Sequence, residues 1–177
     1  MKDKSETEDC LTKNFKNFYE KMYKRVQDQY YLHAEASAYF RKLNYLVTIP
    51  AILMVGTSSA LSFISTSPLV PADAKSSIEI IVGIITSLST IVQTVSSTVG
   101  YGSKAESHKI ASESYNNLIT KLEFEKDVPN EDPEKFVSDL ELDITKIKEK
   151  CNFYIPQQIL LQYKKNSDAE EEQKIQP

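Results

Sequence analysis

The sequence predicts an all-α integral membrane protein, a two-helix transmembrane hairpin with long cytosolic helical extensions that pack as a small bundle. This fold class rests on how charge is distributed over the 177 residues. Charged side chains are excluded from two long windows, Leu43 to Ala72 and Ile80 to Ser103. Each window is long enough for a helix to cross the roughly 30 Å hydrocarbon core of a bilayer. The connection between the spans is short, so they must run antiparallel and leave both termini on one side.

Residues 1–42 are expected to form an N-terminal cytosolic amphipathic helix. Its aromatic and other inward positions recur at three- and four-residue steps, which places them on one face of a helix. They are Phe15, Phe18, Tyr19, Met22, Tyr23, Val26, Tyr30, His33, Ser37 and Phe40. Such a stripe can line a ligand groove or pack against another helix, and packing is the interpretation that we favour.

The transmembrane hairpin is predicted over residues 43–103, with spans at 43–64 and 77–103 and a turn at 65–76. Pro50 lies inside the first span and removes one backbone donor there. Gly56 and Ala60 have the small-xxx-small spacing that lets membrane helices approach closely, although small residues are also simply common in such helices. Ser76 and Glu79 have capping-box spacing, which predicts the start of the second span.

The second span is not uniformly apolar. Winding it at about 100° per residue collects small and polar residues on one side, namely Gly83, Thr86, Thr90, Gln93, Thr94, Ser97 and Tyr101. This face can be a close-packed helix seam, because hydroxyl groups bond their own helix backbone. If several hairpins assembled with this face inward, it would instead line a water-filled pore. Gln93 is the most informative member, because an amide in mid-membrane is costly without a partner.

Residues 104–163 are predicted to form further cytosolic helices. One apolar register can pack on the aromatic stripe of the first helix, and it consists of Ala111, Tyr115, Leu118 and Leu122. A second register gives a third helix face, and it consists of Phe136, Leu140, Ile144 and Ile147. The sequence VPNEDP at residues 128–133 is expected to separate the two helices. Residues 164–177 are polar and acidic, which predicts a mobile tail.

The balance of basic residues predicts the orientation of the hairpin. Arg41, Lys42, Lys104 and Lys109 flank it on the terminal side, against Lys75 alone in the turn. The positive-inside rule then places both termini in the cytosol. The net charge of −4 argues against a nucleic-acid partner. The expected partners are the lipid bilayer and either further copies of the chain or other membrane proteins.

Few residues could carry catalysis, and the sequence has no HExxH, Walker, GxSxG or GxGxxG motif. We therefore expect no enzyme activity, no small-molecule substrate and no cofactor. Cys10 and Cys151 lie far apart and lack CxxC or histidine spacing. They predict two free thiols in a reducing compartment and no metal site.

The two histidines lie close to the hairpin, one before the first span and one after the second. An antiparallel hairpin would bring them to the same side, in a membrane-proximal polar cluster of His33, Glu35, Arg41, Glu106 and His108. Because imidazole titrates near neutral pH, this cluster could respond to protons. The alternative, which we favour, is a pair of hydrogen-bonded histidines at a helix interface.

Two segments resemble the SLATT superfamily of two-span membrane proteins. They are HAEASAYFRKLNYLVTIPAILMVG, beginning at His33, and SKAESHKIASESYNNLITKLEFEKDVP, beginning at Ser103. The resemblance covers roughly residues 15–163 and is greatest to the branch found in large double-stranded DNA viruses. Bacterial members imply a pore-forming or membrane-perturbing effector. The viral branch implies a component of the particle's internal membrane, with both termini on the side equivalent to the cytosol and other virion proteins as partners.

The sequence and the resemblance together suggest three possible functions for this chain. The leading one is a structural or scaffolding component of a viral membrane that links it to neighbouring proteins. The second is an oligomeric pore, motivated by Gln93 and its hydroxyl neighbours. A soluble helical binding protein is the third, and it conflicts with the two uncharged windows, which would each need burial in lipid.

Overall fold

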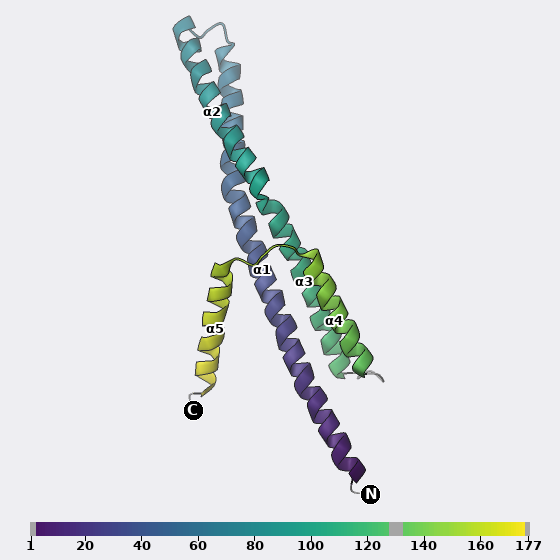
Figure 1. Ribbon diagram of the computed structural model, residues 1–177. Coiled ribbons are helices and arrows are strands. Elements are labelled where there is room, and N and C mark those ends of the chain that lie inside the picture. Colours follow the sequence, from purple (N-terminus) through teal and green to yellow (C-terminus); the bar gives the residue numbers. More distant parts are fainter. Residues whose placement is uncertain (1–2, 128–132, 176–177) are drawn as a thin grey trace. The chain divides into compact units, whose positions relative to one another are not determined.

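The computed structural model describes the backbone of residues 3–127 and 133–175 and the side chains of residues 17–126 and 134–169. Across these residues it has five helices and no strand, so the predicted all-helical class is confirmed. The helices are α1 (Asp3–Ser65), α2 (Ala72–Val99), α3 (Tyr101–Asp127), α4 (Pro133–Lys150) and α5 (Gln157–Ile175) (Figure 1). They divide into two compact units: residues 1–37 with 106–177, here the helical unit, and residues 38–105, here the hairpin unit.

The hairpin unit pairs the C-terminal part of α1 with α2 (Figure 1). Small side chains form the contact between them: Ala51, Ser58 and Ser89 are its buried residues. The connection spans residues 66–71 and is shorter than the turn predicted at 65–76. Small residues at this contact allow the two backbones to approach closely, as in membrane helix pairs.

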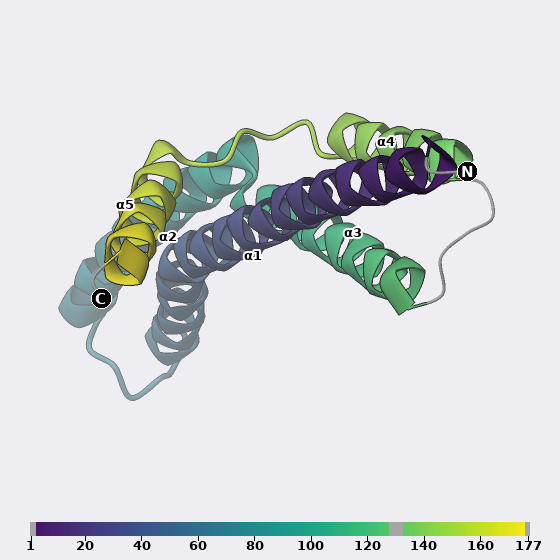
Figure 2. The same cartoon turned by 90° about the horizontal axis from the view of Figure 1, so that it is seen from below.

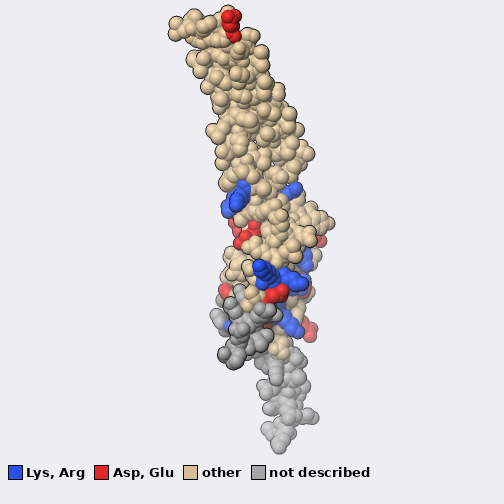
Figure 3. Space-filling view, turned by 90° about the vertical axis from the view of Figure 1, so that its left-hand side faces the viewer, with Lys and Arg blue, Asp and Glu red and all other residues tan. Residues whose placement is uncertain are grey.

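Most apolar side chains of the hairpin unit point away from the contact and are exposed. In the most apolar 18-residue window of α1, only 11% is buried. In the corresponding window of the stretch Ala72–Lys126, which comprises α2 and α3, only 6% is buried. Figure 3 shows an uncharged face along this unit, with acidic atoms at the end that carries the turn. Both helices are therefore long and apolar enough to cross a membrane, and most of their apolar side chains are exposed.

The start of α2 differs from the prediction. α2 begins at Ala72, after Pro71 at the N-cap position, and Ser76 lies within its second turn. The predicted capping box of Ser76 and Glu79 is therefore wrong. Pro71 has a φ of −59°, and proline at a helix start loses no hydrogen bond, since the first backbone N–H groups have no partner within the helix. Its position, rather than that of the serine, marks the start.

A glycine lies between the second span and the following helix. Gly100 has a φ of +65°, and its backbone N–H donates to the carbonyl of Ser96 at 3.0 Å. This left-handed conformation ends α2, and glycine adopts it without the steric cost of a side chain. α3 begins at the next residue, so Tyr101, predicted to lie on the polar face of the second span, belongs to α3.

The helical unit has a core formed by side chains of α1, α3 and α4, three helices that Figure 2 shows from below. Its buried residues are Met22, Val26, Ala111, Tyr115, Leu118, Leu122, Leu140, Ile144 and Ile147, with Phe18, Tyr19, Tyr23, Tyr30 and Phe136 packed against them. The predicted packing of Ala111, Tyr115, Leu118 and Leu122 on the aromatic stripe is confirmed, and the register predicted as a third helix face lies in the same core. The stripe residues in this core therefore serve helix packing; the side chain of Phe15 lies outside the described part.

The last helix packs on the first, since the hydroxyl of Tyr163 in α5 donates to Asp28 Oδ1 of α1 at 2.5 Å. α5 continues through residues 164–175, so the part of the predicted tail that the structure describes is helical. The predicted break at residues 128–133 falls mostly on residues 128–132, which lie outside the described part. Pro133 begins α4, as expected of a proline in the first turn.

Candidate functional site

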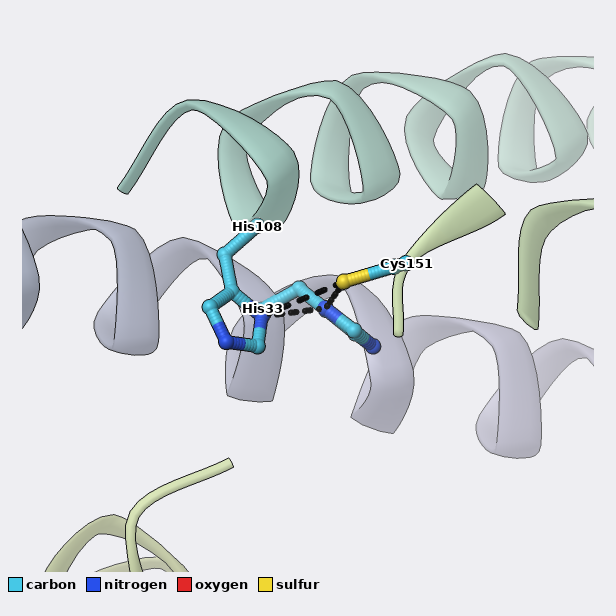
Figure 4. A group of neighbouring side chains, drawn as sticks. All are labelled: His33, His108 and Cys151. Carbon is cyan, nitrogen blue, oxygen red and sulfur yellow. Dashed lines mark hydrogen bonds between the residues drawn. The ribbon is translucent and has the colours of Figure 1, made fainter. Parts of the chain in front are cut away.

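Three residues with nitrogen or sulfur ligand atoms meet inside the helical unit. His33 comes from α1, His108 from α3, and Cys151 follows directly after α4 (Figure 4). His33 and His108 are buried positions of their helices. Cys151 continues the row of Leu140, Ile144 and Ile147 by one further turn, and its N–H bonds the Ile147 carbonyl at 3.1 Å. The register of three packed helices therefore brings these side chains together.

The side chains point toward one another (Figure 4). The Nδ1 atoms of His33 and His108 lie 3.0 Å apart, so one ring donates a proton and the other accepts it. Cys151 Sγ lies 3.6 Å from His108 Nδ1 and 3.9 Å from His33 Nδ1. His108 is fully buried, His33 is 8% exposed and Cys151 is partly exposed. All three ligand atoms lie within 4.8 Å of one another.

Burial favours the neutral form of both imidazoles. It lowers the pKa of His33 to about 4, with a further contribution from the charge of His108. The pKa of His108 is also lowered by burial, against which a hydrogen bond with the backbone of Tyr154 acts. Burial raises the pKa of the Cys151 thiol, partly offset by the backbone of Phe153. A proton-responsive cluster near neutral pH is therefore disfavoured, because removing either imidazolium from water is costly.

The prediction that His33 and His108 lie near each other agrees with this arrangement, but the charged residues expected beside them lie elsewhere. Glu35 and Glu106 are exposed on the helical unit, and Glu106 lies 3.9 Å from Lys109. Arg41 belongs to the hairpin unit and is also exposed. Cys151 was missed because spacing in sequence gave no sign of it; extending the apolar row of α4 by one turn would have found it.

The polar face predicted on the second span is divided between the helix contact and the outside of the hairpin unit. Thr86 Oγ1 lies 2.7 Å from Ser58 Oγ of α1, so it contributes to the contact. Ser89, which was not predicted, is the buried residue of α2. The other members of the face within α2 are exposed: Gly83, Thr90, Gln93, Thr94 and Ser97.

The exposed polar side chains have partners within their own hairpin. Thr90, Thr94 and Ser97 each donate to a backbone carbonyl three or four residues earlier. Gln93 Nε2 donates to Ser89 Oγ at 3.2 Å, and that hydroxyl donates to the carbonyl of Ala51 at 3.4 Å. The amide of Gln93 thus finds the partner that a mid-membrane position requires.

The predicted packing residues of the first span do not face α2. Pro50, Gly56 and Ala60 are exposed, and a Cβ atom added at Gly56 would have no neighbour within 4 Å. Ala51 and Ser58 occupy the contact instead, because positions seven residues apart return to the same side of a helix. Any close contact of Gly56 and Ala60 would thus involve another molecule.

These positions outline two candidate sites: the cluster of His33, His108 and Cys151 in the helical unit, and the exposed polar face of α2 in the hairpin unit. The contacts that define each site lie within a single unit. Comparison with protein-family models, with curated proteins and with solved structures found no match for this chain.

Proposed function

We propose that this chain is a non-enzymatic, two-span membrane protein with a structural or scaffolding role. The observation that carries the proposal is the exposure of the apolar side chains in the hairpin unit. Exposed large residues cover both of its helices, including Leu46, Ile52, Leu53, Phe63, Ile80, Ile84 and Ile91. A contiguous apolar surface of this length is unstable in water and suits hydrocarbon.

The polar groups of the hairpin support the same proposal. A span in lipid must satisfy its hydrogen-bonding groups internally. The Ser58–Thr86 contact and the relay from Gln93 through Ser89 do so inside the hairpin unit. The hairpin can therefore serve as an anchor without a second copy.

The helical unit would lie outside the bilayer on the side of both termini. Arg41, Lys42, Lys104 and Lys109 mark this as the cytosolic side, or its equivalent in a virus. In the scaffolding role the helical unit binds neighbouring proteins while the hairpin anchors it. The resemblance of the two quoted segments points to the internal membrane of a large DNA virus particle as the location.

Lysine substitution on the exposed apolar face tests membrane insertion. In lipid, Ile84→Lys should cost about 3–4 kcal/mol of insertion free energy and move protein from the carbonate-resistant membrane pellet to the supernatant. On a soluble helix an exposed lysine would be harmless. Leu142→Lys is the matched control, because Leu142 is an exposed leucine of the helical unit. Equal partitioning of the two variants would contradict insertion.

The structural role has its own test. Antibody detection in purified particles, with and without detergent stripping of the internal membrane, should find the protein in the membrane fraction at high copy number. Cross-linking from exposed lysines of the helical unit, such as Lys121, should yield adducts with a shell protein. Absence of the protein from purified particles would overturn the viral scaffolding role and leave the membrane proposal standing.

A pore is the second candidate, favoured by the exposure of Thr90, Gln93, Thr94 and Ser97 on one side of α2. If these residues line a pore formed by several copies, purified protein should release ions from liposomes and Gln93→Leu should reduce the release. Ile91→Leu, on the exposed apolar side, is the control. Liposomes that stay sealed between about pH 5 and pH 8, across the titration range of histidine, would contradict the pore.

A further inference from the structure

The histidine and cysteine cluster joins three segments that lie far apart in the chain. His33, His108 and Cys151 come from α1, α3 and the residue after α4, and they lie within the core of one unit. Their ligand atoms face a common point (Figure 4). If the two histidines served only helix packing, the hydrogen bond between their rings would be sufficient. Packing does not require that the sulfur of Cys151 also lie close to both Nδ1 atoms.

We propose that His33 Nδ1, His108 Nδ1 and Cys151 Sγ bind one Zn²⁺ ion. In a tetrahedral zinc site with bonds of about 2.1 Å to nitrogen and about 2.3 Å to sulfur, two nitrogens lie about 3.4 Å apart and a nitrogen lies about 3.6 Å from a sulfur. The corresponding distances are 3.0 Å between the nitrogens and 3.6 and 3.9 Å to the sulfur. Shifts of about 0.4 Å or less would complete the geometry.

The donor set selects the class of metal. Imidazole nitrogen and thiolate sulfur suit zinc and other borderline or soft transition ions, whereas calcium and magnesium require oxygen ligands. The cluster of His33, His108 and Cys151 contains no carboxylate. Three protein ligands leave a fourth position for water or an external ligand, next to Cys151, the least buried of the three.

Binding through Nδ1 leaves the second ring nitrogen of each histidine to be oriented by another group. Metal-bound histidines generally donate this other ring N–H to a backbone carbonyl or carboxylate, which fixes the ring and its tautomer. The backbone of Tyr154 acts on the His108 imidazole and raises its pKa, so it is the candidate acceptor for that ring. On binding, the ion replaces the hydrogen bond between the two Nδ1 atoms, and the thiol of Cys151 releases its proton to solvent.

Zinc at this position would cross-link α1, α3 and α4 and stabilise the helical unit. Because all three ligands belong to that unit, the inference is independent of membrane insertion and of the proposed scaffolding role. Ligands contributed by segments that are distant in sequence make binding dependent on the folded bundle. The unfolding temperature should therefore rise with the Zn²⁺ concentration.

The test uses the full chain, purified in detergent with a phosphine reductant. We expect inductively coupled plasma mass spectrometry to find one zinc ion per chain. Substitution with Co²⁺ should give the visible bands of a tetrahedral ion and a sulfur-to-cobalt charge-transfer band. Cys151→Ser should abolish the charge-transfer band and weaken Zn²⁺ binding by at least about tenfold, since even loss of an outer-shell partner costs tenfold or more. His33→Asn and His108→Asn should weaken binding similarly.

Cys10→Ser is the matched control. Cys10 precedes His33 by 23 positions in α1, or about 34 Å along the helix, so this variant should retain the metal and the charge-transfer band. Circular dichroism and the metal-free unfolding temperature show whether each variant folds. The proposal is overturned if folded Cys151→Ser and Cys10→Ser bind Zn²⁺ equally, or if the wild-type chain binds none. It is also overturned if zinc leaves the unfolding temperature unchanged.

Discussion

Ser58 Oγ and Thr86 Oγ1 lie 2.7 Å apart and form a hydrogen bond between the two helices of the hairpin unit. Ser89 adds a second link, from its hydroxyl to the carbonyl of Ala51. The hairpin therefore pairs polar groups across its contact while its apolar side chains face outward. A helix pair that is to reside in lipid needs this arrangement, because water is absent there to satisfy polar groups.

Removing the Ser58–Thr86 hydrogen bond should weaken the hairpin by a small, measurable amount. In a double-mutant cycle of Ser58→Ala and Thr86→Val we expect a coupling free energy of about 0.6 kcal/mol, the average for membrane helices. Unfolding in mixed micelles, followed by circular dichroism, measures it. Ser59→Ala is the control, because that hydroxyl bonds the Val55 carbonyl of its own helix. A cost for the control that equals that of Ser58→Ala would contradict the contact.

Truncating Leu122 should be among the most destabilising changes in the helical unit. Leu122 is 1% exposed and belongs to the core of α1, α3 and α4. Leu122→Ala should lower the free energy of unfolding by about 2–5 kcal/mol, through lost burial and the cavity that remains. Leu142→Ala, at an exposed position of α4, should change it by less than about 0.5 kcal/mol. Urea unfolding monitored by helical circular dichroism compares the two.

Two tyrosine hydroxyls of the helical unit, one partly and one fully buried, should respond differently to removal. The Tyr19 hydroxyl donates to the carbonyl of Leu122 at 2.6 Å, so Tyr19→Phe should cost about 1 kcal/mol. Tyr115 is fully buried, and its hydroxyl has no hydrogen-bond partner among the described residues. Tyr115→Phe should therefore change stability by less than about 0.5 kcal/mol or increase it. A greater loss for Tyr115→Phe than for Tyr19→Phe in denaturant unfolding would refute this assignment.

The ion pair of Lys121 and Asp143 should make stability depend on pH in the acidic range. Lys121 Nζ lies 2.7 Å from Asp143 Oδ2, and this hydrogen bond lowers the pKa of Asp143 below its ordinary value of 3.8. The carboxylate of Asp143 therefore binds a proton more readily in the unfolded chain than in the folded one. The stabilisation is complete above the ordinary pKa and is lost as pH falls through the lowered one.

Asp143→Asn tests this dependence. The variant should be less stable than the wild type by about 0.2–1 kcal/mol at pH 7, because the pair is partly exposed, and the difference should vanish near pH 2. Asp139→Asn, an exposed position of α4 with no ion pair among the described residues, is the control. Unfolding measured at several pH values compares them, and a difference that grows as pH falls would contradict the assignment.

The secondary structure and the two apolar windows could be predicted because they depend on local patterns. Charge is absent from residues 43–72 and 80–103, and inward-facing positions recur with helical spacing elsewhere. The core positions Tyr115, Leu122 and Ile144 follow from that spacing. The boundaries of α2 did not follow from these patterns. Pro71 marks its start in place of the expected cap at Ser76, and the left-handed Gly100 marks its end.

Residue contacts across helices were decided only by the tertiary structure. By itself the sequence determined that the chain is helical, that two helices are apolar, and that His33 and His108 both lie within ten residues of the predicted hairpin. Helical periodicity gives the polarity of each face but not the rotation of one helix against another. That rotation buries Ser89, leaves Gln93 exposed and brings Cys151 to the two histidines, because side-chain packing selects one register among several with similar patterns.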